Sequence, residues 1–331
     1  MDYERGGRQK ECYSESEVAL RNCPLCGNKD YVHIYVERGN IGIVRCKKCG
    51  LIYVNPMVKD PEKNYWGDEK KYFEEARLIF EGKAKSHRDA NYLEDLNVIE
   101  KIKPKGIFLD IGTNAGFFLR HTRGKKWNVV GIDPSPTLSE MAIKYFRLNV
   151  KTCYLNEAGF EDEYFDVVTM TDVFEHIPEP KKLLADIKKV IKKDGILFIK
   201  VPNGKYNMLK LWLAKAAGKV KDYDIFDSYE HVTHFTHKTL KRMLAECGFK
   251  VTKSYIGKPI QLPAWHKYVG HYYQYPSPWF LDWKNYTMRS LFYWISKVER
   301  VLRFGNIGYF APNIIMIATK KDLYVRDMRE D

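Results

Sequence analysis

Strands that alternate with helices constrain the fold of this 331-residue chain more than any other feature of its sequence. Short apolar runs bounded by turn residues predict buried strands at Gly106–Ile111, Val129–Ile132, Asp166–Thr171 and Ile196–Val201. Strands separated by helices favour an α/β fold with a doubly wound parallel sheet covered on both faces. Ligands of such sheets bind beyond the carboxyl ends of the strands, so the turns there hold the informative residues.

Helix signals fill the segments between and after these strands. Ser135, with Pro136 at the first helical position, predicts a helix that runs through Arg147. Apolar residues at helical spacing predict another helix over Lys181–Lys193, before Asp194 and Gly195. The other predicted elements are a helix from about Phe117, a helix at Leu240–Cys247, and strands at Phe249–Tyr255 and Asn313–Thr319.

Four of the seven cysteines form two Cys-x-x-Cys pairs: Cys23, Cys26, Cys46 and Cys49. A glycine follows each pair and can take the positive φ that turns backbone N–H groups toward the thiolates. The spacing predicts a zinc ribbon, with short strands at Val32–Val36 and Ile41–Arg45 between the pairs. Two disulfides or a redox pair are the alternatives. The first twenty residues are too polar for a secretion signal, which disfavours disulfides, and a redox motif would not come doubled.

An acidic residue ends each of the first two strands of the core. Asp110 opens the glycine-bearing turn Asp110–Gly116, and Asp133 follows the next strand. Asp110 would repel a pyrophosphate, so this turn suits a ligand with an ammonium group. An acid at the end of the second strand can accept hydrogen bonds from both hydroxyls of a ribose. Ordinary strand-end caps are the alternative for both residues.

These strand ends resemble those of the class I S-adenosylmethionine-dependent methyltransferases. The blocks that carry the likeness are FLDIGTNAG (Phe108–Gly116), VVGIDP (Val129–Pro134), FDVVTMTDVFEHIP (Phe165–Pro178) and GILFIKVPN (Gly195–Asn203). The resemblance implies a seven-stranded Rossmann-like methyltransferase sheet and S-adenosylmethionine as cofactor. The cysteine pairs followed by GLIYVNP (Gly50–Pro56) look like the zinc-binding N-terminus of many bacterial and archaeal members.

The resemblance also implies which residues bind the cofactor. Asparagine stands at position 114, where the family often has a second glycine, and asparagine tolerates unusual φ better than most residues. The expected cofactor residues are Asp110, Gly112, Thr113, Asn114 and Gly116 at the methionine half, Asp133 and Pro134 at the ribose, Thr171 and Asp172 at the sulfonium, and Asn156 near the adenine.

A hydroxyl or carbon acid that accepts a methyl group needs a base, and histidine is best suited to that task. The candidates are His176, His231 and His234. The segment around Glu230 and His231 looks like that of the sugar C-methyltransferases, in which a Glu-His pair does acid–base work near the acceptor. Capping of a helix that begins near Thr236 is the alternative. His176 lies in a block shared by members with different acceptors, so a scaffold or cofactor-lid role competes with catalysis.

Two further stretches, Met208–Val220 and Gly257–Phe310, show apolar residues at helical spacing opposed by basic residues. The second stretch is rich in aromatic residues. Such helices can lie in an anionic membrane interface, and packing over the acceptor site is the alternative. The expected domains are a zinc ribbon with disordered first residues (1–57), a helical lead-in (58–104), the methyltransferase core (105–256), an aromatic-rich helical insertion over the acceptor site (257–311), and a final strand with a polar tail (312–331).

The formal net charge of +13 favours anionic partners. Without an export signal or a membrane span, we expect a cytoplasmic enzyme that is peripheral to the inner face of the membrane. The favoured function is methyl transfer to a sugar or lipid-linked glycan. The alternatives are an RNA methyltransferase that uses the basic surface and the ribbon, and a non-catalytic scaffold that binds S-adenosylmethionine.

Overall fold

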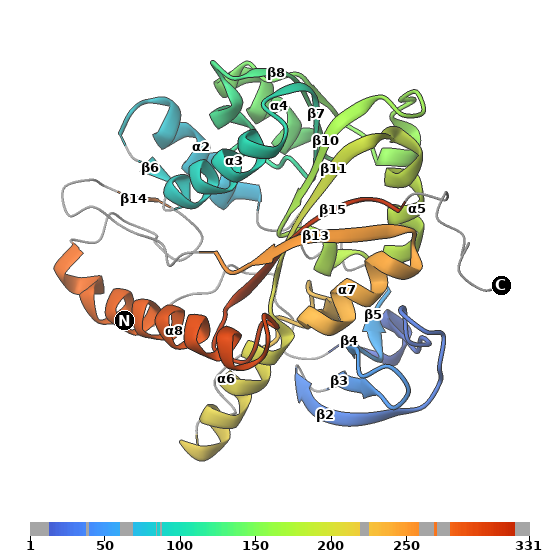
Figure 1. Cartoon of the computed structure of the whole chain (residues 1–331). Coiled ribbons are helices and arrows are strands. Elements are labelled where there is room, and N and C mark those ends of the chain that lie inside the picture. The colour runs from blue at the N-terminus through green and yellow to red at the C-terminus, as the bar shows by residue number, and fades with distance from the viewer. Residues whose placement is uncertain are drawn as a thin grey trace.

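A seven-stranded sheet forms the centre of the molecule in the computed structural model (Figure 1), which describes residues 13–37, 40–59, 69–83, 85–86, 88–218, 225–257, 268–269 and 279–321. In spatial order the strands are β13 (Phe249–Tyr255), β15 (Asn313–Lys320), β11 (Ile191–Pro202), β10 (Phe165–Thr171), β7 (Lys105–Ile111), β8 (Lys126–Ile132) and β9 (Val150–Lys151). Strand β15 is antiparallel to both neighbours, and the other neighbouring pairs are parallel. The predicted fold class is confirmed, and β9 is the strand that the sequence analysis missed.

Helices cover both faces of this sheet, as a doubly wound fold requires (Figure 1). Apolar side chains of α5 (Pro180–Val190) and α7 (His237–Glu246) pack in one hydrophobic cluster with the sheet. Those of α3 (Asp89–Ile102) and α4 (Pro136–Phe146) pack in a second cluster. Helix α2 (Glu69–Phe80) lies against α4. The helices therefore cover the faces of the sheet, and the carboxyl ends of the parallel strands β7, β8 and β10 lie together at one edge of it.

The prediction of a helix from about Phe117 is wrong. Only a short 3₁₀ turn, η2 (Leu119–Thr122), follows the glycine turn in the part of the chain described there. Phe117, Phe118 and Leu119 are all buried. Three consecutive apolar side chains cannot share the single inward face of a surface α-helix, so the segment folds as a tight turn within the core.

The helix predicted over Lys181–Lys193 ends earlier than expected. Helix α5 stops at Val190, and Ile191 is already the first residue of β11. Ile191 is fully buried and pairs with Phe165 of β10. Pairing and burial in the sheet therefore override the local helical pattern of Lys192 and Lys193.

A smaller four-stranded sheet lies beside the core (Figure 1). Its order is β12 (Thr233–His234), β4 (Ile52–Val54), β3 (Ile41–Cys46) and β2 (Tyr31–Glu37). Strands β2 and β3 confirm the two strands predicted between the cysteine pairs. Strand β12 comes from far along the chain and pairs with β4. The N-terminal element is thus completed by a segment of the methyltransferase core, which no local pattern indicated.

Short elements complete the described chain. They are η1 (Glu15–Glu17), β1 (Val18–Ala19) paired with β5 (Met57–Val58), β6 (Lys85–Ser86) paired with β14 (Tyr268–Val269), η3 (Leu155–Glu157) and η4 (Phe174–His176). The expected disorder of the first residues, the polar tail from 322, and most of the insertion between 258 and 278 lie outside the described residues.

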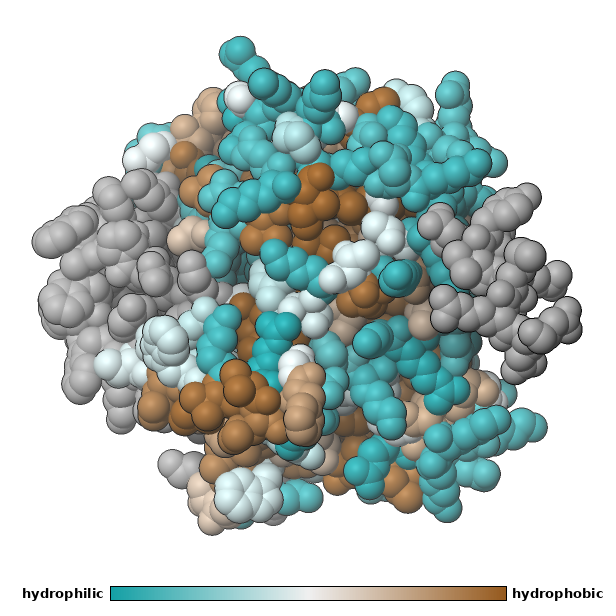
Figure 2. All heavy atoms as spheres, in the orientation of Figure 1, coloured by the Kyte–Doolittle hydropathy of each residue, from teal (hydrophilic) through white to brown (hydrophobic). Residues whose placement is uncertain are grey.

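Helices α6 (Gly204–Ala216) and α8 (Trp279–Leu302) form where helical spacing predicted them. The buried positions of α6 include Asn207 and Leu211, whereas Trp212 and Leu213 are exposed. On α8, Ser296 is buried, and a row of apolar side chains faces outward: Leu291, Trp294, Val298, Val301 and Leu302. Hydrophobic side chains accordingly gather over α8 at the lower left of Figure 2.

The sequence left open whether these apolar faces meet a membrane or pack over the acceptor site, and Trp212, Leu213 and the apolar row on α8 are exposed. The other side of α8 makes polar contacts with the chain both before and after the helix. Glu299 accepts hydrogen bonds from the backbone N–H groups of Tyr309 and Phe310, and Arg300 donates to the carbonyl oxygen of Ser254. None of the described helices is long and apolar enough to cross a membrane.

Candidate active site

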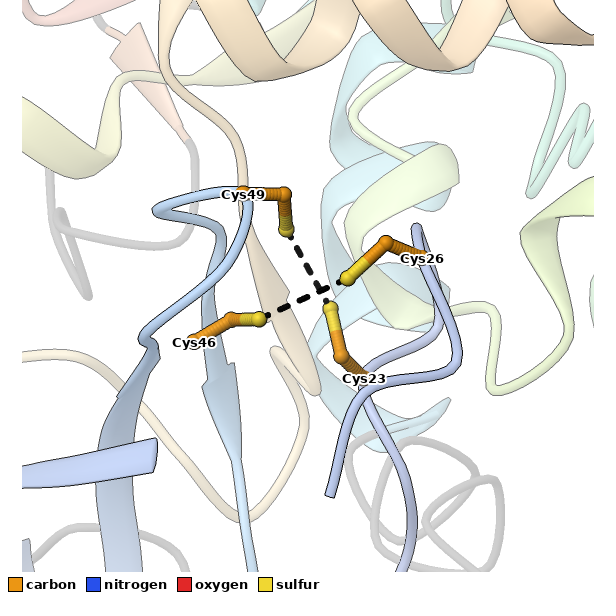
Figure 3. Close-up of side chains that lie close together, drawn as sticks. All are labelled: Cys23, Cys26, Cys46 and Cys49. Carbon is orange, nitrogen blue, oxygen red and sulfur yellow. Dashed lines mark hydrogen bonds between the residues drawn. The ribbon is translucent and has the colours of Figure 1, made fainter. Parts of the chain in front are cut away.

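The four paired cysteines converge on one point beside the small sheet (Figure 3). Cys23 Sγ lies 3.4 Å from Cys49 Sγ, and Cys26 Sγ lies 3.5 Å from Cys46 Sγ. Both separations exceed the ~2.05 Å bond of a disulfide. They approach the roughly 3.8 Å edge of a sulfur tetrahedron around a zinc ion at ~2.3 Å from each ligand. All four are free cysteines, so the disulfide alternative is wrong.

The backbone around these cysteines stabilises thiolates. Gly27 and Gly50 take φ values of +70° and +76°. In each turn two backbone N–H groups donate to the sulfur of the first cysteine, Cys23 or Cys46. Thiolates are the form that binds metal, and hydrogen bonds to sulfur orient and tune such ligands. The residues present therefore fit a closed four-sulfur zinc site without an open position for catalysis.

Asp110 lies at the carboxyl end of β7, where it is only 3% exposed. Thr169 donates to one of its carboxylate oxygens at 2.6 Å, and Thr113 donates to the other at 3.1 Å. Burial raises the pKa of Asp110 to about 7, and the neighbouring charge of Asp133 adds to the rise. A buried carboxylate near a second one is stabilised by a cationic ligand, because positive charge favours its ionised form.

Asp133 directly follows β8 and holds the first turn in place. It accepts hydrogen bonds from the backbone N–H groups of Asn114, at 2.7 Å, and Ser135, at 3.0 Å. Each carboxylate oxygen can accept more than one hydrogen bond, so these contacts leave capacity for ribose hydroxyls. Asn114 takes a φ of 53°, the left-handed conformation expected of it. Pro134, next in the chain, is half-buried.

Gly112 and Gly116 are required by packing as well as by their positive φ values of +71° and +83°. A Cβ atom at Gly112 would lie 2.5 Å from Cγ2 of Val173, and one at Gly116 would lie 2.5 Å from Cδ1 of Leu148. The turn therefore lies directly against the segment that follows β10. This contact brings the glycine turn after β7 close to Thr171 and Asp172, the residues expected near the sulfonium.

Thr171 and Asp172 lie at the end of β10, which neighbours β7. The hydroxyl of Thr171 is buried and has no hydrogen-bond partner among the described residues. Asp172 takes a φ of 54° and forms an ion pair with Arg88 at 2.7 Å. By contrast, the Asn156 side chain is exposed in η3, and no hydrogen bond within the described ranges joins it to the other candidates.

His176 and His231 lie edge to face, with ring centroids 4.6 Å apart. The carboxylate of Glu175 lies beside both rings. His176 donates a hydrogen bond to the backbone carbonyl oxygen of Glu230, and burial, aided by His231, lowers the pKa of His176 to about 3. A group with that pKa stays neutral near pH 7 and is a weak base, which favours a positioning role for His176.

The third histidine candidate, His234, is buried and packs edge-on against Phe226, with ring centroids 5.0 Å apart. Burial holds its pKa well below the usual range of histidine. The helix-capping alternative for Glu230 and His231 is wrong, because Thr236 caps α7 by accepting a hydrogen bond from the Thr239 N–H. Strand β12 separates the Glu-His pair from that helix.

Two N-terminal residues that the sequence analysis missed hold the histidine segments in place. Glu37, at the end of β2, is buried, and its carboxylate accepts hydrogen bonds from three backbone N–H groups: those of Ile225, Phe226 and Ser228. The guanidinium of Arg21 donates to the carbonyl oxygens of Pro178 and Val232. The N-terminal element thus contacts the segment that follows His176 and the segments before and after His231.

The sequence analysis also missed a buried ion pair between β11, the strand next to β10, and α3. Lys200 Nζ lies 2.8 Å from Asp95 Oδ2, and both side chains are buried. A signal for it was present: Lys200 interrupts the apolar strand GILFIKVP, and a lysine inside a buried strand requires a partner. The partner lies on α3, at a sequence distance that no local pattern bridges.

A model of the methyltransferase-domain family matches residues 84–254, the part of the chain that contains all of these strand ends. An uncharacterised protein of Methanocaldococcus jannaschii is 27% identical over 164 residues, which are 49% of this chain and 74% of that one. A ubiquinone biosynthesis O-methyltransferase of Pasteurella multocida is 25% identical over 43% of this chain and 67% of its own. The enzyme of that name from Glaesserella parasuis is 31% identical over 30% of this chain and 49% of its own length. The chain thus spans between half and three quarters of the length of these relatives.

Among solved structures, a methyltransferase of Archaeoglobus fulgidus dependent on S-adenosylmethionine covers 74% of this chain with 99% of its own, at 19% identity and a TM-score of 0.46. The 1,6-didemethyltoxoflavin-N1-methyltransferase of Burkholderia thailandensis covers 84% with 97% of its own, at 13% identity and a TM-score of 0.47.

The chain therefore belongs to the methyltransferase-domain family, whose model matches more than half of it. Together with the sheet order and the acids at the strand ends, this makes it an S-adenosylmethionine-dependent methyltransferase. The residues at the carboxyl edge of the sheet fit that cofactor: a buried acid for its ammonium group, a second acid for its ribose, and a tight turn between them.

Proposed function

We propose that this methyltransferase acts on a sugar or lipid-linked glycan and transfers the methyl group to a hydroxyl oxygen. The observation that carries the proposal is the contact between His176 and His231, with Glu230 directly before His231 in the chain. This pair follows the pattern of the sugar methyltransferases named above. The relatives named as O-methyltransferases of ubiquinone biosynthesis support oxygen as the acceptor atom.

The reaction is an in-line displacement. S-adenosylmethionine supplies a methyl group bound to positively charged sulfur. Asp110 would hold the ammonium group of this cofactor, and Asp133 would hold its ribose. The acceptor oxygen forms a bond to the methyl carbon as the carbon–sulfur bond breaks, and the electron pair of that bond stays on sulfur. His231 accepts the hydroxyl proton, and His176 and Glu230 position His231. Holding the two reacting atoms in line supplies much of the rate.

We assign one structural zinc ion to Cys23, Cys26, Cys46 and Cys49. The sulfur separations, the glycine turns and the backbone N–H groups at the sulfurs support this assignment. The ribbon then serves the acceptor side of the site through Glu37 and Arg21, and the cofactor side needs no contribution from it.

The proposed function is tested with labelled S-adenosylmethionine and a panel of nucleotide sugars, lipid-linked glycans and RNA. We expect methyl transfer to a glycan acceptor, and His231→Ala should abolish turnover while it leaves cofactor affinity within a few-fold. His33→Ala, which removes an exposed histidine of the small sheet, is the matched control and should retain activity.

Unchanged turnover of His231→Ala would remove His231 as the base. Methylation of RNA alone, with an affinity that falls steeply as salt rises, would instead establish the nucleic-acid alternative that the net charge of +13 favours.

We further propose that the exposed row on α8 contacts an anionic membrane surface, where a lipid-linked acceptor resides. Leu291, Trp294, Val298, Val301 and Leu302 are between 52 and 78% exposed. Lys297 lies on the same helix, with its ammonium group over the ring of Tyr293. Apolar side chains beside basic ones match the interface of an anionic bilayer, which attracts both.

Co-sedimentation with vesicles measures this contact. The protein should bind vesicles of phosphatidylglycerol and phosphatidylcholine more tightly than vesicles of phosphatidylcholine alone. Trp294→Asp combined with Val298→Asp should weaken binding by at least about tenfold, since burial of each side chain is worth roughly 1.5–3 kcal/mol. Ile143→Asp, at an exposed apolar position on α4, is the control and should bind normally. Equal binding by the double variant would rule out this surface.

A further inference from the structure

A second cluster of metal-ligating side chains lies apart from the four cysteines. The carboxylate of Glu175 and the imidazoles of His176 and His231 each offer one atom, and these three atoms lie within 4.8 Å of one another. Glu175 and His176 come from η4, directly after β10, whereas His231 comes from the segment before β12. The fold thus brings together two histidines and one carboxylate from two distant parts of the chain.

The environment of Glu175 is unusual for a carboxylate. The residue is 2% exposed, and neither carboxylate oxygen has a hydrogen-bond partner among the described residues. Buried acids are ordinarily paired with donors or coordinate metals, because an unpaired buried charge is costly. One of its oxygens lies within 4.8 Å of a ring nitrogen of each of the two imidazoles.

The orientation of His176 also suits a ligand. One ring nitrogen donates to the carbonyl oxygen of Glu230, so in a neutral imidazole the other nitrogen is the one that can act as a metal ligand. Histidines that bind metals commonly hold their second nitrogen in this way, with a backbone carbonyl as partner. The same carbonyl belongs to the residue before His231, so one hydrogen bond fixes both histidine segments relative to each other.

From this geometry we propose that Glu175, His176 and His231 bind a divalent cation of the Mn²⁺ or Fe²⁺ type. Two imidazoles and one carboxylate suit such ions and leave open positions for a substrate. An ion at about 2.1 Å from each ligand requires neighbouring ligand atoms roughly 3–4 Å apart, and the three ligand atoms here lie within 4.8 Å of one another. This site differs from the ribbon both in its ligands and in its open positions.

The cation also indicates how the proposed acceptor would be bound and activated, and this part of the inference rests on the proposed function. An acceptor with two adjacent oxygens, such as a sugar diol, can fill two open positions. Coordination lowers the pKa of the bound hydroxyl, so its proton leaves to solvent before the oxygen attacks the methyl carbon. The resulting oxyanion lies between two positive centres, the cation and the sulfonium. His231 then serves as a ligand, and the cation takes over the task of the base.

Manganese binding tests the site without any acceptor. The probe is MnCl₂ added to the full-length protein with its ribbon loaded with zinc, and free Mn²⁺ is followed by electron paramagnetic resonance. We expect one bound Mn²⁺ per chain, with binding weakened at least about tenfold in both His231→Ala and Glu175→Gln. Glu179→Gln removes an exposed carboxylate at the start of α5, outside the cluster, and should bind Mn²⁺ as the unaltered protein does.

Calorimetry with S-adenosylmethionine checks that each variant is folded. If Glu175→Gln does not fold, His231→Ala, which replaces a half-buried side chain, decides alone. Absence of Mn²⁺ binding, or full turnover after removal of every metal but the ribbon zinc, would overturn the cation site and leave His231 as the base. Mn²⁺ binding without methyl transfer to any glycan would instead refute the proposed acceptor and retain the site.

Discussion

Asp110→Asn is expected to weaken S-adenosylmethionine binding by about two to three orders of magnitude. The carboxylate is buried at the end of β7 and oriented by Thr169 and Thr113, and an amide keeps its size but not its charge. Removing one partner of a buried charge pair costs roughly 2–5 kcal/mol of binding free energy. Isothermal titration calorimetry measures the effect directly.

The pH dependence of binding has a defined sign. Burial raises the pKa of Asp110 to about 7. In the role assigned to it, Asp110 binds the ammonium group of the cofactor in its ionised form. The affinity of the unaltered protein should therefore fall as the pH drops below about 7, whereas the affinity of Asp110→Asn should change much less. A pH-independent affinity of the unaltered protein would contradict the assigned role of Asp110.

The same group affects stability in the opposite direction. Its pKa in the folded chain without cofactor lies above the ordinary value of 3.8, so its contribution to stability is largest at low pH and is lost as the pH rises through about 7. Without cofactor, Asp110→Asn should therefore melt at a higher temperature than the unaltered protein at pH 8, and the difference should shrink at pH 5.5. Thermal unfolding at both pH values measures this.

Loss of the ribbon metal is expected to abolish turnover while cofactor affinity changes little. Cys26→Ala should remove the single zinc ion of the ribbon, since metal binding and folding of such elements are coupled. The ribbon holds the His231 segment through Glu37 and through the pairing of β12 with β4. Asp110 lies on β7 and Asp133 directly follows β8, both strands of the large sheet, so neither residue should depend on these contacts.

Metal analysis, calorimetry with S-adenosylmethionine and hydrogen exchange over residues 225–234 give the three readouts. Cys153→Ala, which replaces a half-buried cysteine outside the cluster, should keep zinc and activity. Glu37→Gln separates metal from positioning: we expect it to keep the zinc but to lose at least about tenfold in turnover, because a buried charged acceptor of three N–H groups is neutralised. Parallel loss of cofactor affinity in Cys26→Ala would show that the ribbon supports the whole fold.

Several interpretations from the sequence depended on patterns that span only a few residues, and the corresponding elements are in the structure. The alternation of strands and helices predicted the sheet, and Ser135 caps α4 as its position before Pro136 indicated. Burial differs from the helical spacing of apolar residues at two places. The run from Phe117 is buried on all sides, and α8 turns Ser296 and Glu299 inward while its apolar row faces outward. Hydrophobic spacing defines a face of a helix, but it does not say which face the rest of the chain will cover.

By itself the sequence determined the two cysteine turns, the acids at the ends of β7 and β8, and the family to which the chain belongs, because each of these rests on residues close together in the chain. Only the tertiary structure decided that Glu175 and His176 meet His231, that Glu37 and Arg21 hold both of their segments, and that β12 completes the ribbon sheet. Those contacts join segments far apart in sequence, and they follow from how the two sheets pack, which no local pattern of residues encodes.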